Sequence, residues 1–276
     1  MAIGVIDIGS NSIRYMGSGG KQLTTTRLAA GLDEHGMLRK ENMCRSIDAI
    51  RTYVALARAQ GLTPYAYATS AVRDAINRDE FVGRVLSECG IAVDVLTGER
   101  EAHYAYLGAA DGDGGLLDIG GGSSQLITGG FSASYPMGCV RAMEAISGDT
   151  LEALSASLAA VCGPLYRFAR IFTPHWTGVG GTITTLAAFK LGLSTYDSVA
   201  ISTCVLTQGD VSSLIHAIYS IGAAARSVHP LLAQRHDVIV PGALLLDYIM
   251  HGMGISSLSV SDRDGMEGYA MYIAQL

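Results

Sequence analysis

The feature that most constrains this chain is a triple glycine between two short hydrophobic segments. Residues 116–119 have the composition of a buried strand, residues 120–122 form a tight glycine turn, and residues 123–128 fold back as a second strand. Glycines accept positive φ and carry no Cβ, so the backbone N–H groups of this turn can approach a phosphate closely. Asp118, at the end of the first strand, is placed to hold Mg²⁺ beside that phosphate, directly or through water.

The chain repeats this arrangement near its N-terminus. A hydrophobic strand there runs into Asp7, Ile8 and Gly9 and is followed by small hydroxyl and amide residues. A third glycine element, at residues 178–186, opens a helix whose positive dipole and N–H groups suit an anion. Because two similar hairpins lie far apart in the chain, we expect two similar lobes that face each other across a phosphate-binding cleft.

Composition supports a compact globular protein. Of 276 residues, 49% are hydrophobic and 16% charged, which is enough to form a large core in two lobes. The net charge of −6 argues against a protein that coats nucleic acid and against one that binds a membrane surface. We find no signal peptide and no apolar run of the roughly 20 residues that a membrane helix needs. Five scattered cysteines without a Cys-x-x-Cys pair favour a reducing, cytoplasmic environment.

Strands alternate with helices in both halves, which predicts an α/β fold. The clearest linker is residues 111–115, and we place the lobe boundary there. Asp79 and Asp149 are predicted to cap helices, and Pro164 to kink a helix over residues 150–172. Residues 69–75 are predicted to form a loop over a site.

Several charged residues have ordinary alternative explanations. Glu101 would by itself be an acidic residue in the solvated first turn of a helix, and Arg73 a surface ion-pair partner. Asp7 would be an ordinary strand-end residue were it not for the repeated hairpin. The His236-Asp237 pair resembles a metal-binding dipeptide, but no second His and Asp cluster accompanies it, so we interpret it as a helix start.

Taken together, the motifs resemble the exopolyphosphatase and guanosine pentaphosphate phosphohydrolase family of the actin-like superfamily. The matching stretches follow the family's order over nearly the whole chain, and jointly they are highly specific. They are DIGSNSIR from Asp7, TTTRLAAGLDEHGML from Thr24, ATSAVRDA from Ala68, TGEREA from Thr97, DIGGGSSQL from Asp118, GVGGTITTLA from Gly178 and the SD-G-EG pattern from Ser261.

The resemblance implies Mg²⁺-dependent hydrolysis of a terminal phosphoanhydride in inorganic polyphosphate or pppGpp. It implies two actin-like (ribonuclease H-like) lobes, the first comprising residues 1–113 and 262–276 and the second residues 114–261. Glu101 matches the carboxylate that activates water, and Asp7, Glu101 and Asp118 are the expected metal-site residues. The expected phosphate-binding residues, including those of the third glycine element, are Ser10, Asn11, Arg73, Gly120, Gly121, Gly122, Ser123, Gly180, Gly181 and Thr182.

The sequence departs from the family at Gln125, where a second glutamate is usual. A glutamine can orient water but cannot take a proton, so we expect Glu101 to be the base and Gln125 to hold the water. The departure also supports an alternative, a weakly active or inactive sensor of polyphosphate or guanosine polyphosphate. A second alternative is an ATP-dependent phosphotransferase of the same superfamily.

The sequence ends where longer family members continue into a C-terminal HD-type domain, and none is expected here. Because that domain would add surface for a long substrate, we expect short polyphosphate chains or a nucleotide to be favoured. Dimers are common in the family, so a homodimer is an open alternative, although no surface feature of the sequence indicates one.

Overall fold

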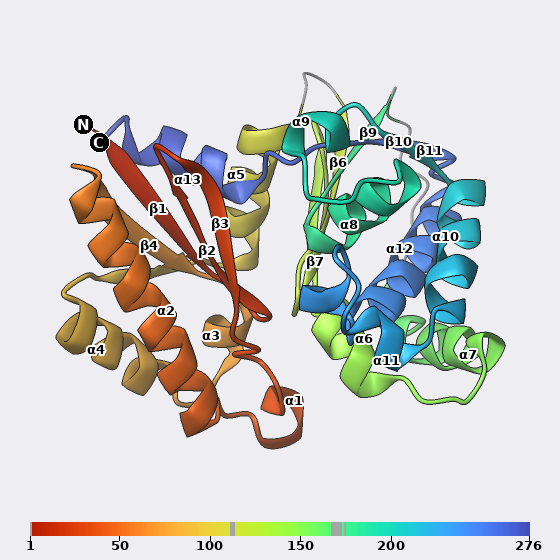
Figure 1. Cartoon of the computed structure of the whole chain (residues 1–276), viewed down its shortest axis with the longest axis horizontal. Coiled ribbons are helices and arrows are strands. Elements are labelled where there is room, and N and C mark those ends of the chain that lie inside the picture. The colour runs from red at the N-terminus through yellow and green to blue at the C-terminus, as the bar shows by residue number, and fades with distance from the viewer. Residues whose placement is uncertain (1, 111–113, 167–172, 174) are drawn as a thin grey trace. The chain divides into compact units, whose positions relative to one another are not determined.

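The computed structural model describes residues 2–110, 114–166, 173 and 175–276, and the chain divides into two compact units (Figure 1). The first unit comprises Met1–Gly108 and Gly265–Leu276, and the second comprises Ala109–Asp264. The predicted linker includes residues 111–113, which lie outside the described residues. Within the described ranges, no helix is both long and apolar enough to cross a membrane.

The first unit is built on a five-stranded sheet with strand order β3-β2-β1-β4-β5. The first three strands form an antiparallel meander, whereas β4 and β5 continue from β1 in parallel. β1 is the central strand, which explains why five of its six residues are buried. The strands are β1 (Ile3–Ile8), β2 (Ser12–Gly17), β3 (Gly20–Thr25), β4 (Thr63–Ala68) and β5 (Val93–Val95).

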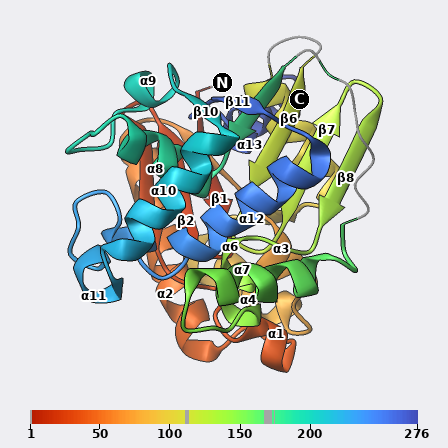
Figure 2. The same cartoon turned by 90° about the vertical axis from the view of Figure 1, so that its right-hand side faces the viewer.

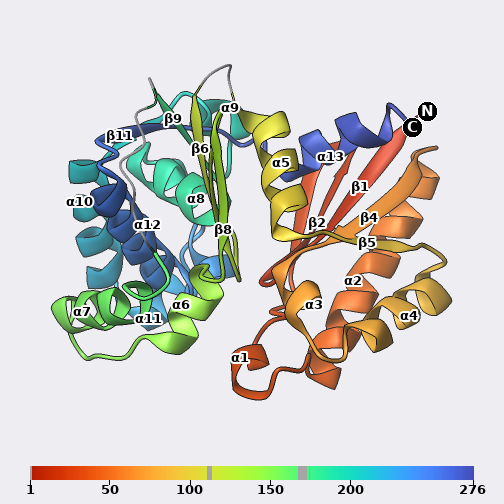
Figure 3. The same cartoon turned by 180° about the vertical axis from the view of Figure 1, so that it is seen from behind.

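Helices cover both faces of this sheet. On one face lies α2, in which the apolar residues that recur at three-and-four spacing are buried. On the other face, α5 and α13 pack with β1 and β4 through Tyr104, Tyr269, Val5 and Tyr67 (Figure 3). The helices are α1 (Leu32–His35), α2 (Lys40–Ala59), α3 (Ser70–Asp74), α4 (Arg78–Cys89), α5 (Gly98–Ala109) and α13 (Gly265–Ile273).

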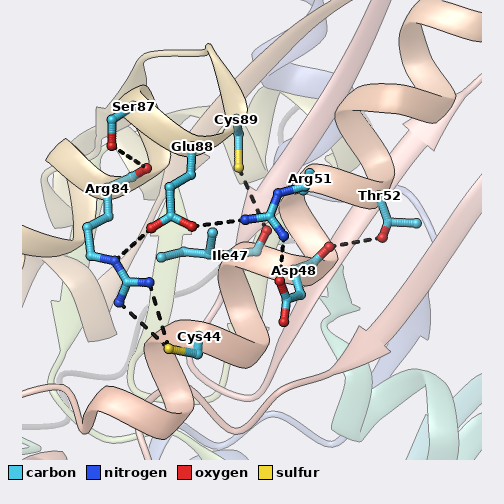
Figure 4. Close-up of polar contacts among 9 residues, drawn as sticks. All are labelled: Cys44, Ile47, Asp48, Arg51, Thr52, Arg84, Ser87, Glu88 and Cys89. Carbon is cyan, nitrogen blue, oxygen red and sulfur yellow. Dashed lines mark hydrogen bonds and ion pairs between the residues drawn. The ribbon is translucent and has the colours of Figure 1, made fainter.

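Charged side chains join α2 to α4 along their exposed edge. Glu88 accepts from Arg84 at 2.8 Å and from Arg51 at 2.9 Å, and Arg51 also donates to Asp48 (Figure 4). The Arg84 guanidinium lies 3.7 Å from the Cys44 sulfur. Exposed pairs of this kind contribute little each, so the packing of α2 against α4 rests mainly on their buried apolar residues.

The second unit is built on a six-stranded sheet with strand order β10-β11-β9-β6-β7-β8. Its β6-β7-β8 meander repeats β1-β2-β3, and β9 runs parallel to β6 as β4 does to β1. The predicted repeat of the hairpin is therefore confirmed. The strands are β6 (Gly115–Ile119), β7 (Ser124–Thr128), β8 (Phe131–Tyr135), β9 (Trp176–Val179), β10 (Val205–Thr207) and β11 (Ser257–Val260).

A buried helix, α12, organises the core of the second unit. It packs against α6, α7, α8 and α10, and eleven of its residues are buried (Figure 2). Its nearly continuous apolar sequence is typical of a helix that is buried on most of its faces. The helical elements are α6 (Cys139–Ala145), α7 (Leu151–Cys162), α8 (Gly181–Lys190), α9 (Ser198–Ile201), α10 (Gln208–Ser220), α11 (Ala223–Arg226), the 3₁₀ turn η1 (Ala233–Arg235) and α12 (Ile239–Met253).

Two predicted helix caps are wrong. Thr150, rather than Asp149, caps α7, because its side chain accepts from the Ala153 N–H. Asp79 lies in the first turn of α4, whose N-cap position is Asn77. A threonine and an aspartate are both good N-caps, so the sequence alone does not choose between adjacent ones.

The structure also changes two predicted segments. α7 ends at Cys162, so Pro164 follows the helix instead of kinking it. Residues 167–172 of the predicted longer helix lie outside the described residues. The segment predicted as a loop at residues 69–75 contains the short helix α3, which presents Arg73 in its last turn.

Candidate functional site

The first glycine turn links β1 to β2 and is closed by its own backbone. The N–H of Gly9 donates to the Ser12 carbonyl at 3.1 Å, and the Ser10 hydroxyl lies 3.0 Å from the hydroxyl of Ser70 at the start of α3. The Ala29 N–H donates to the Ser10 carbonyl at 2.9 Å. These contacts hold the turn in one conformation, as a preorganised anion site requires.

Asn11 is the residue of this turn whose surroundings most clearly indicate a ligand. Its side chain is 5% exposed, yet neither its amide nitrogen nor its amide oxygen has a hydrogen-bond partner in the part of the chain that the structure describes. The Thr26 hydroxyl, next to it, is buried and unpartnered within the same residues. Buried polar groups are normally hydrogen-bonded, so this pair fits a site that is completed by a bound polar group.

The backbone beside Asn11 also adopts an unusual conformation. The Asn11 carbonyl accepts from both Thr26 N and Arg27 N, and Arg27 has a φ of 50°. Arg27 is the one non-glycine residue with positive φ among the described residues, and such residues occur often at functional sites. The sequence alone indicated no role for Thr26 or Arg27, although both lie in the segment from Thr24 that matches the family.

Asp7 is buried at 4% exposure and is paired with the guanidinium of Arg14, on the neighbouring strand β2. The Arg14 Nε donates to Asp7 Oδ2 at 2.9 Å. This pairing supplies positive charge beside the carboxylate. We therefore expect Asp7 to bind a metal ion more weakly than an unpaired carboxylate at the same strand end would.

Arg73 and Glu101 form the principal charged pair of the first unit. The Arg73 Nη1 donates to Glu101 Oε2 at 2.8 Å and to the Leu96 carbonyl at 3.1 Å. The Glu101 side chain is 13% exposed and the Arg73 side chain 21% exposed. The carboxylate is thus fixed in orientation, whereas Arg73 Nη2 makes no hydrogen bond within the described residues. Its N–H groups are suited to a phosphate oxygen.

The second glycine turn has the same closure as the first. The Gly120 N–H donates to the Ser123 carbonyl at 3.0 Å, as the Gly9 N–H does to Ser12. The start of α6 packs directly on this turn, because Cys139 N donates to the Gly120 carbonyl at 3.0 Å. A Cβ at Gly138 would lie 2.5 Å from the Gly121 backbone, so this contact requires glycine.

The thiol at this turn is kept neutral. Cys139 is buried, and burial raises the pKa of its thiol, although the positive charge of Arg235 opposes the shift. A neutral thiol adds no negative charge beside a phosphate turn. The free cysteines elsewhere are Cys44, Cys89, Cys162 and Cys204, of which Cys44 alone is only half-buried.

Asp118 lies beside the third glycine element. A Cβ at Gly180 would lie 2.9 Å from Asp118 Oδ1, and Gly180 has a φ of 94°. β6 and β9 are parallel neighbours, with Asp118 opposite Val179. Two glycine elements far apart in the sequence therefore meet around Asp118, and α8 begins there with its positive dipole end.

Gln125 lies directly opposite Asp118 in the β6–β7 pair. The two side chains therefore project on the same face of the sheet. Gln125 is fully buried, and its Nε2 donates to the hydroxyls of Ser123 at 2.9 Å and Ser134 at 3.3 Å. Its Oε1 is buried without a hydrogen-bond partner among the described residues, so it can accept from a water molecule.

Arg235 is a site residue that sequence reasoning missed. A Cβ at Gly181 would overlap the Arg235 guanidinium, so this positive group lies against the first residue of α8. It comes from η1, over fifty residues later in the chain. The neighbouring His236-Asp237 pair is the sequence feature that stands out there, and it gives no indication of Arg235. Gly181 and Arg235 lie far apart in the sequence, and no local sequence pattern indicates that they are in contact.

The structure thus assembles the candidate residues into two sets, one in each unit. The described residues contain no group of three His, Cys, Asp or Glu side chains able to hold a metal by themselves. The first unit holds Asp7, Ser10, Asn11, Arg73 and Glu101, and the second holds Asp118, Gly120, Gly121, Gly122, Ser123, Gln125, Gly180, Gly181, Thr182 and Arg235.

The profile of the Ppx/GppA phosphatase family matches residues 6–274, and the chain therefore belongs to this family. Exopolyphosphatase 2 of Mycobacterium tuberculosis (strain ATCC 25618 / H37Rv) is 29% identical over 99% of this chain and 98% of the relative. The guanosine-5'-triphosphate,3'-diphosphate pyrophosphatase of Vibrio cholerae (strain ATCC 39315 / El Tor Inaba N16961) is 36% identical over 50% of this chain and 32% of its own length.

Solved structures show the same fold. The Aquifex aeolicus member of the Ppx/GppA family has a TM-score of 0.73 at 27% identity, covering 100% of this chain and 98% of that one. The crystal structure of an exopolyphosphatase-like protein has a TM-score of 0.91 at 23% identity, covering 100% and 99%. The expected α/β fold of two actin-like lobes is confirmed.

Proposed function

We propose that this protein hydrolyses a terminal phosphoanhydride bond, releasing phosphate from inorganic polyphosphate or pppGpp, and that Glu101 activates the attacking water. Membership of the family supports phosphoanhydride hydrolysis. The observation that carries the role of Glu101 is its 2.8 Å contact with Arg73, which fixes a largely buried carboxylate in one orientation. Phosphoryl transfer depends chiefly on such positioning and on charge neutralisation.

In the proposed reaction the water oxygen forms a bond to the terminal phosphorus while the bridging P–O bond breaks. The leaving phosphate takes the electron pair of that bond. Glu101 accepts a hydrogen bond from the water, whose proton then passes to the phosphate products. The contact with the Arg73 guanidinium holds the Glu101 carboxylate in position to take this proton and pass it on, a step that a glutamine could not perform.

Positive and N–H groups in each unit support phosphate binding. Arg73 Nη2 and the Asn11 amide serve this purpose in the first unit. In the second, the Arg235 guanidinium lies at the start of α8, where the helix dipole favours an anion. Arginine suits this task because its planar N–H groups match phosphate oxygens.

We propose Mg²⁺ as the cofactor, held by Asp118 together with water and substrate oxygens. Mg²⁺ commonly binds through one or two carboxylates and phosphate groups while keeping several waters, so it does not need a cluster of protein ligands. Asp118 is assigned this role because it lies where the second and third glycine elements meet, with its Oδ1 beside Gly180. The ion would neutralise charge on the phosphate groups.

Gln125 favours one alternative, a sensor that binds the same anions with little turnover. Its buried amide can hold water through Oε1 but adds no negative charge beside Asp118. In the sensor, the phosphate turns would bind without rapid hydrolysis.

Phosphate release by the purified protein with Mg²⁺ tests the proposal. Tripolyphosphate, long-chain polyphosphate, pppGpp and ATP would be compared, each with and without EDTA. We expect EDTA-sensitive release from polyphosphate or pppGpp. Binding without release would favour the sensor, and ATP consumption that requires a small acceptor would favour a phosphotransferase.

The preference for short chains, the homodimer and the cytoplasmic location stay predictions.

A further inference from the structure

A cavity of about 320 Å³ lies in the second unit between α7 and α12. None of the residues assigned to phosphate binding or hydrolysis lines it. Its volume falls at the lower end of the range for small-molecule sites. Its walls include Ser155, Leu158, Leu244, Asp247, Tyr248 and His251.

The carboxylate of Asp247 gives this cavity its chemical character. Its Oδ1 atom is buried and accepts no hydrogen bond within the described residues. His251 Nδ1 lies 3.4 Å from Oδ1, but the same nitrogen is only 2.9 Å from the backbone carbonyl of Asp247. The histidine is therefore engaged by the helix backbone and does not fully satisfy the carboxylate.

Burial affects the same group. It raises the pKa of the Asp247 carboxyl, and the nearby His251 opposes this shift. A carboxylate that is partly removed from water without a hydrogen-bonded partner is stabilised by any cation that can reach it. Oδ1 itself is buried, so a cation would reach the carboxylate through the rest of the side chain, which is 30% exposed.

The rest of the cavity is apolar and aromatic. Leu158 and Leu244 are almost fully buried and form an aliphatic wall. Tyr248 adds an aromatic side chain and Ser155 a hydroxyl group. An anionic group beside an apolar and aromatic surface complements a cation that carries a hydrocarbon body.

We propose that this cavity binds a small organic ammonium ion, with its charged group at Asp247 and its hydrocarbon part against Leu158 and Leu244. The site is separate from the residues proposed for hydrolysis. The inference therefore stands or falls independently of the proposed function.

Titration of the isotope-labelled protein with n-butylammonium chloride, followed by NMR chemical shifts, tests this site. We expect saturable shifts at residues of α7 and α12, with a dissociation constant on the order of millimolar for so small a ligand. n-Butanol has the same hydrocarbon body without the charge, and we expect it to bind at least about tenfold more weakly.

Variants locate the interaction. Asp247→Asn should weaken n-butylammonium binding by about tenfold, whereas Asp149→Asn, which changes an exposed aspartate of the same unit, should not alter it. Absence of saturable shifts, equal binding of n-butanol, or unchanged binding by a folded Asp247→Asn variant would overturn the proposal. The n-butanol comparison needs only the wild-type protein, so it decides the matter even if the variant does not fold.

Discussion

The hydrogen bonds and ion pairs of single residues indicate their roles in this protein. Arg73 uses one nitrogen to hold Glu101, and Asp7 is held by Arg14. Asn11 and Gln125, by contrast, are buried with amide atoms that have no partner among the described residues. Paired groups are positioned by the protein, whereas the unpaired amide atoms are suited to accept or donate to a ligand or water.

Arg235 should matter for substrate binding because its guanidinium lies at the start of α8. Arg235→Ala should lower kcat/KM for polyphosphate or pppGpp by about tenfold to a hundredfold, through loss of a charge-assisted phosphate contact. Steady-state phosphate release would measure the change. Arg78→Ala, at an exposed arginine of the first unit, is the control and should leave kcat/KM unchanged.

Gln125 tests whether the protein is an enzyme or a sensor. Gln125→Glu keeps the size of the side chain, and the Ser123 and Ser134 hydroxyls can rotate to donate to the new carboxylate. If Gln125 already holds the water, the substitution should change kcat by less than about tenfold. A gain of several hundredfold would instead show that the natural glutamine keeps turnover low, as the sensor requires.

The residues of the site were predictable to different degrees. The two Asp-Ile-Gly turns and Gly180–Thr182 were found because tight glycine turns leave a local pattern. The hairpin brings Asp118 and Gln125 opposite each other, and the sequence predicts this hairpin but not its register. Arg235 was missed because its contact with Gly181 depends on the path of the chain between them, which no local pattern records.

At the level of helices and strands, the length of an element and the turn signals beside it decided what could be predicted. Long helices such as α2 and α10 show several turns of apolar periodicity. This periodicity predicts helices over residues 41–60 and 210–221, whose ends differ from the observed ones by one or two residues. α9, α11 and β10 contain four residues or fewer and were not predicted. Such short elements complete too few turns to show a period. The strands at residues 176–179 and 257–260 are equally short but were predicted with their observed bounds, because their apolar residues lie next to glycine or serine turn signals.

The capping box of α10 provides a pH-dependent test of one element. Asp210 accepts from the Lys190 Nζ at 2.7 Å and from the Thr207 N–H at 2.9 Å. The hydrogen bond from Lys190, followed by those from Thr207, lowers the pKa of Asp210 to about 2. A lowered pKa means that the ionised form stabilises the folded state. This contribution is complete above the ordinary pKa near 4 and is lost between about pH 4 and pH 2.

We therefore expect Asp210→Asn to lower the free energy of unfolding by about 0.5–1 kcal/mol at pH 7. The difference from wild type should shrink as the pH falls from about 4 toward 2. Urea unfolding at a series of pH values measures it. Asp149→Asn is the control, and a difference for Asp210→Asn that stayed constant down to pH 2 would contradict the assignment.

On the scale of the whole molecule, the chain forms one unit, then a second, and returns to the first with α13. The repeated hairpin predicted this duplication, because each copy needs its own sheet and core. The return of the last helix was implied by the family resemblance rather than by any periodicity. α13 joins the first unit through Met266 and Tyr269, which pack with Tyr104 and Val5.

The docking of α13 depends on Gly268. A Cβ there would overlap the Tyr104 carbonyl in α5, so Gly268→Ala should destabilise the first unit by about 1–3 kcal/mol. Gly83→Ala is the matched control, since nothing lies near that position in α4 and alanine favours a helix. It should stabilise the same unit by about 0.5–1 kcal/mol. Thermal unfolding of both variants checks the opposite signs.

The measurement that most directly tests the account is phosphate release by Glu101→Gln beside Glu99→Gln. Both glutamates lie in the first turn of α5, but only Glu101 is held by Arg73. We predict that Glu101→Gln lowers kcat by at least about a hundredfold, whereas Glu99→Gln retains the wild-type rate. Full turnover by a folded Glu101→Gln variant would contradict the central claim.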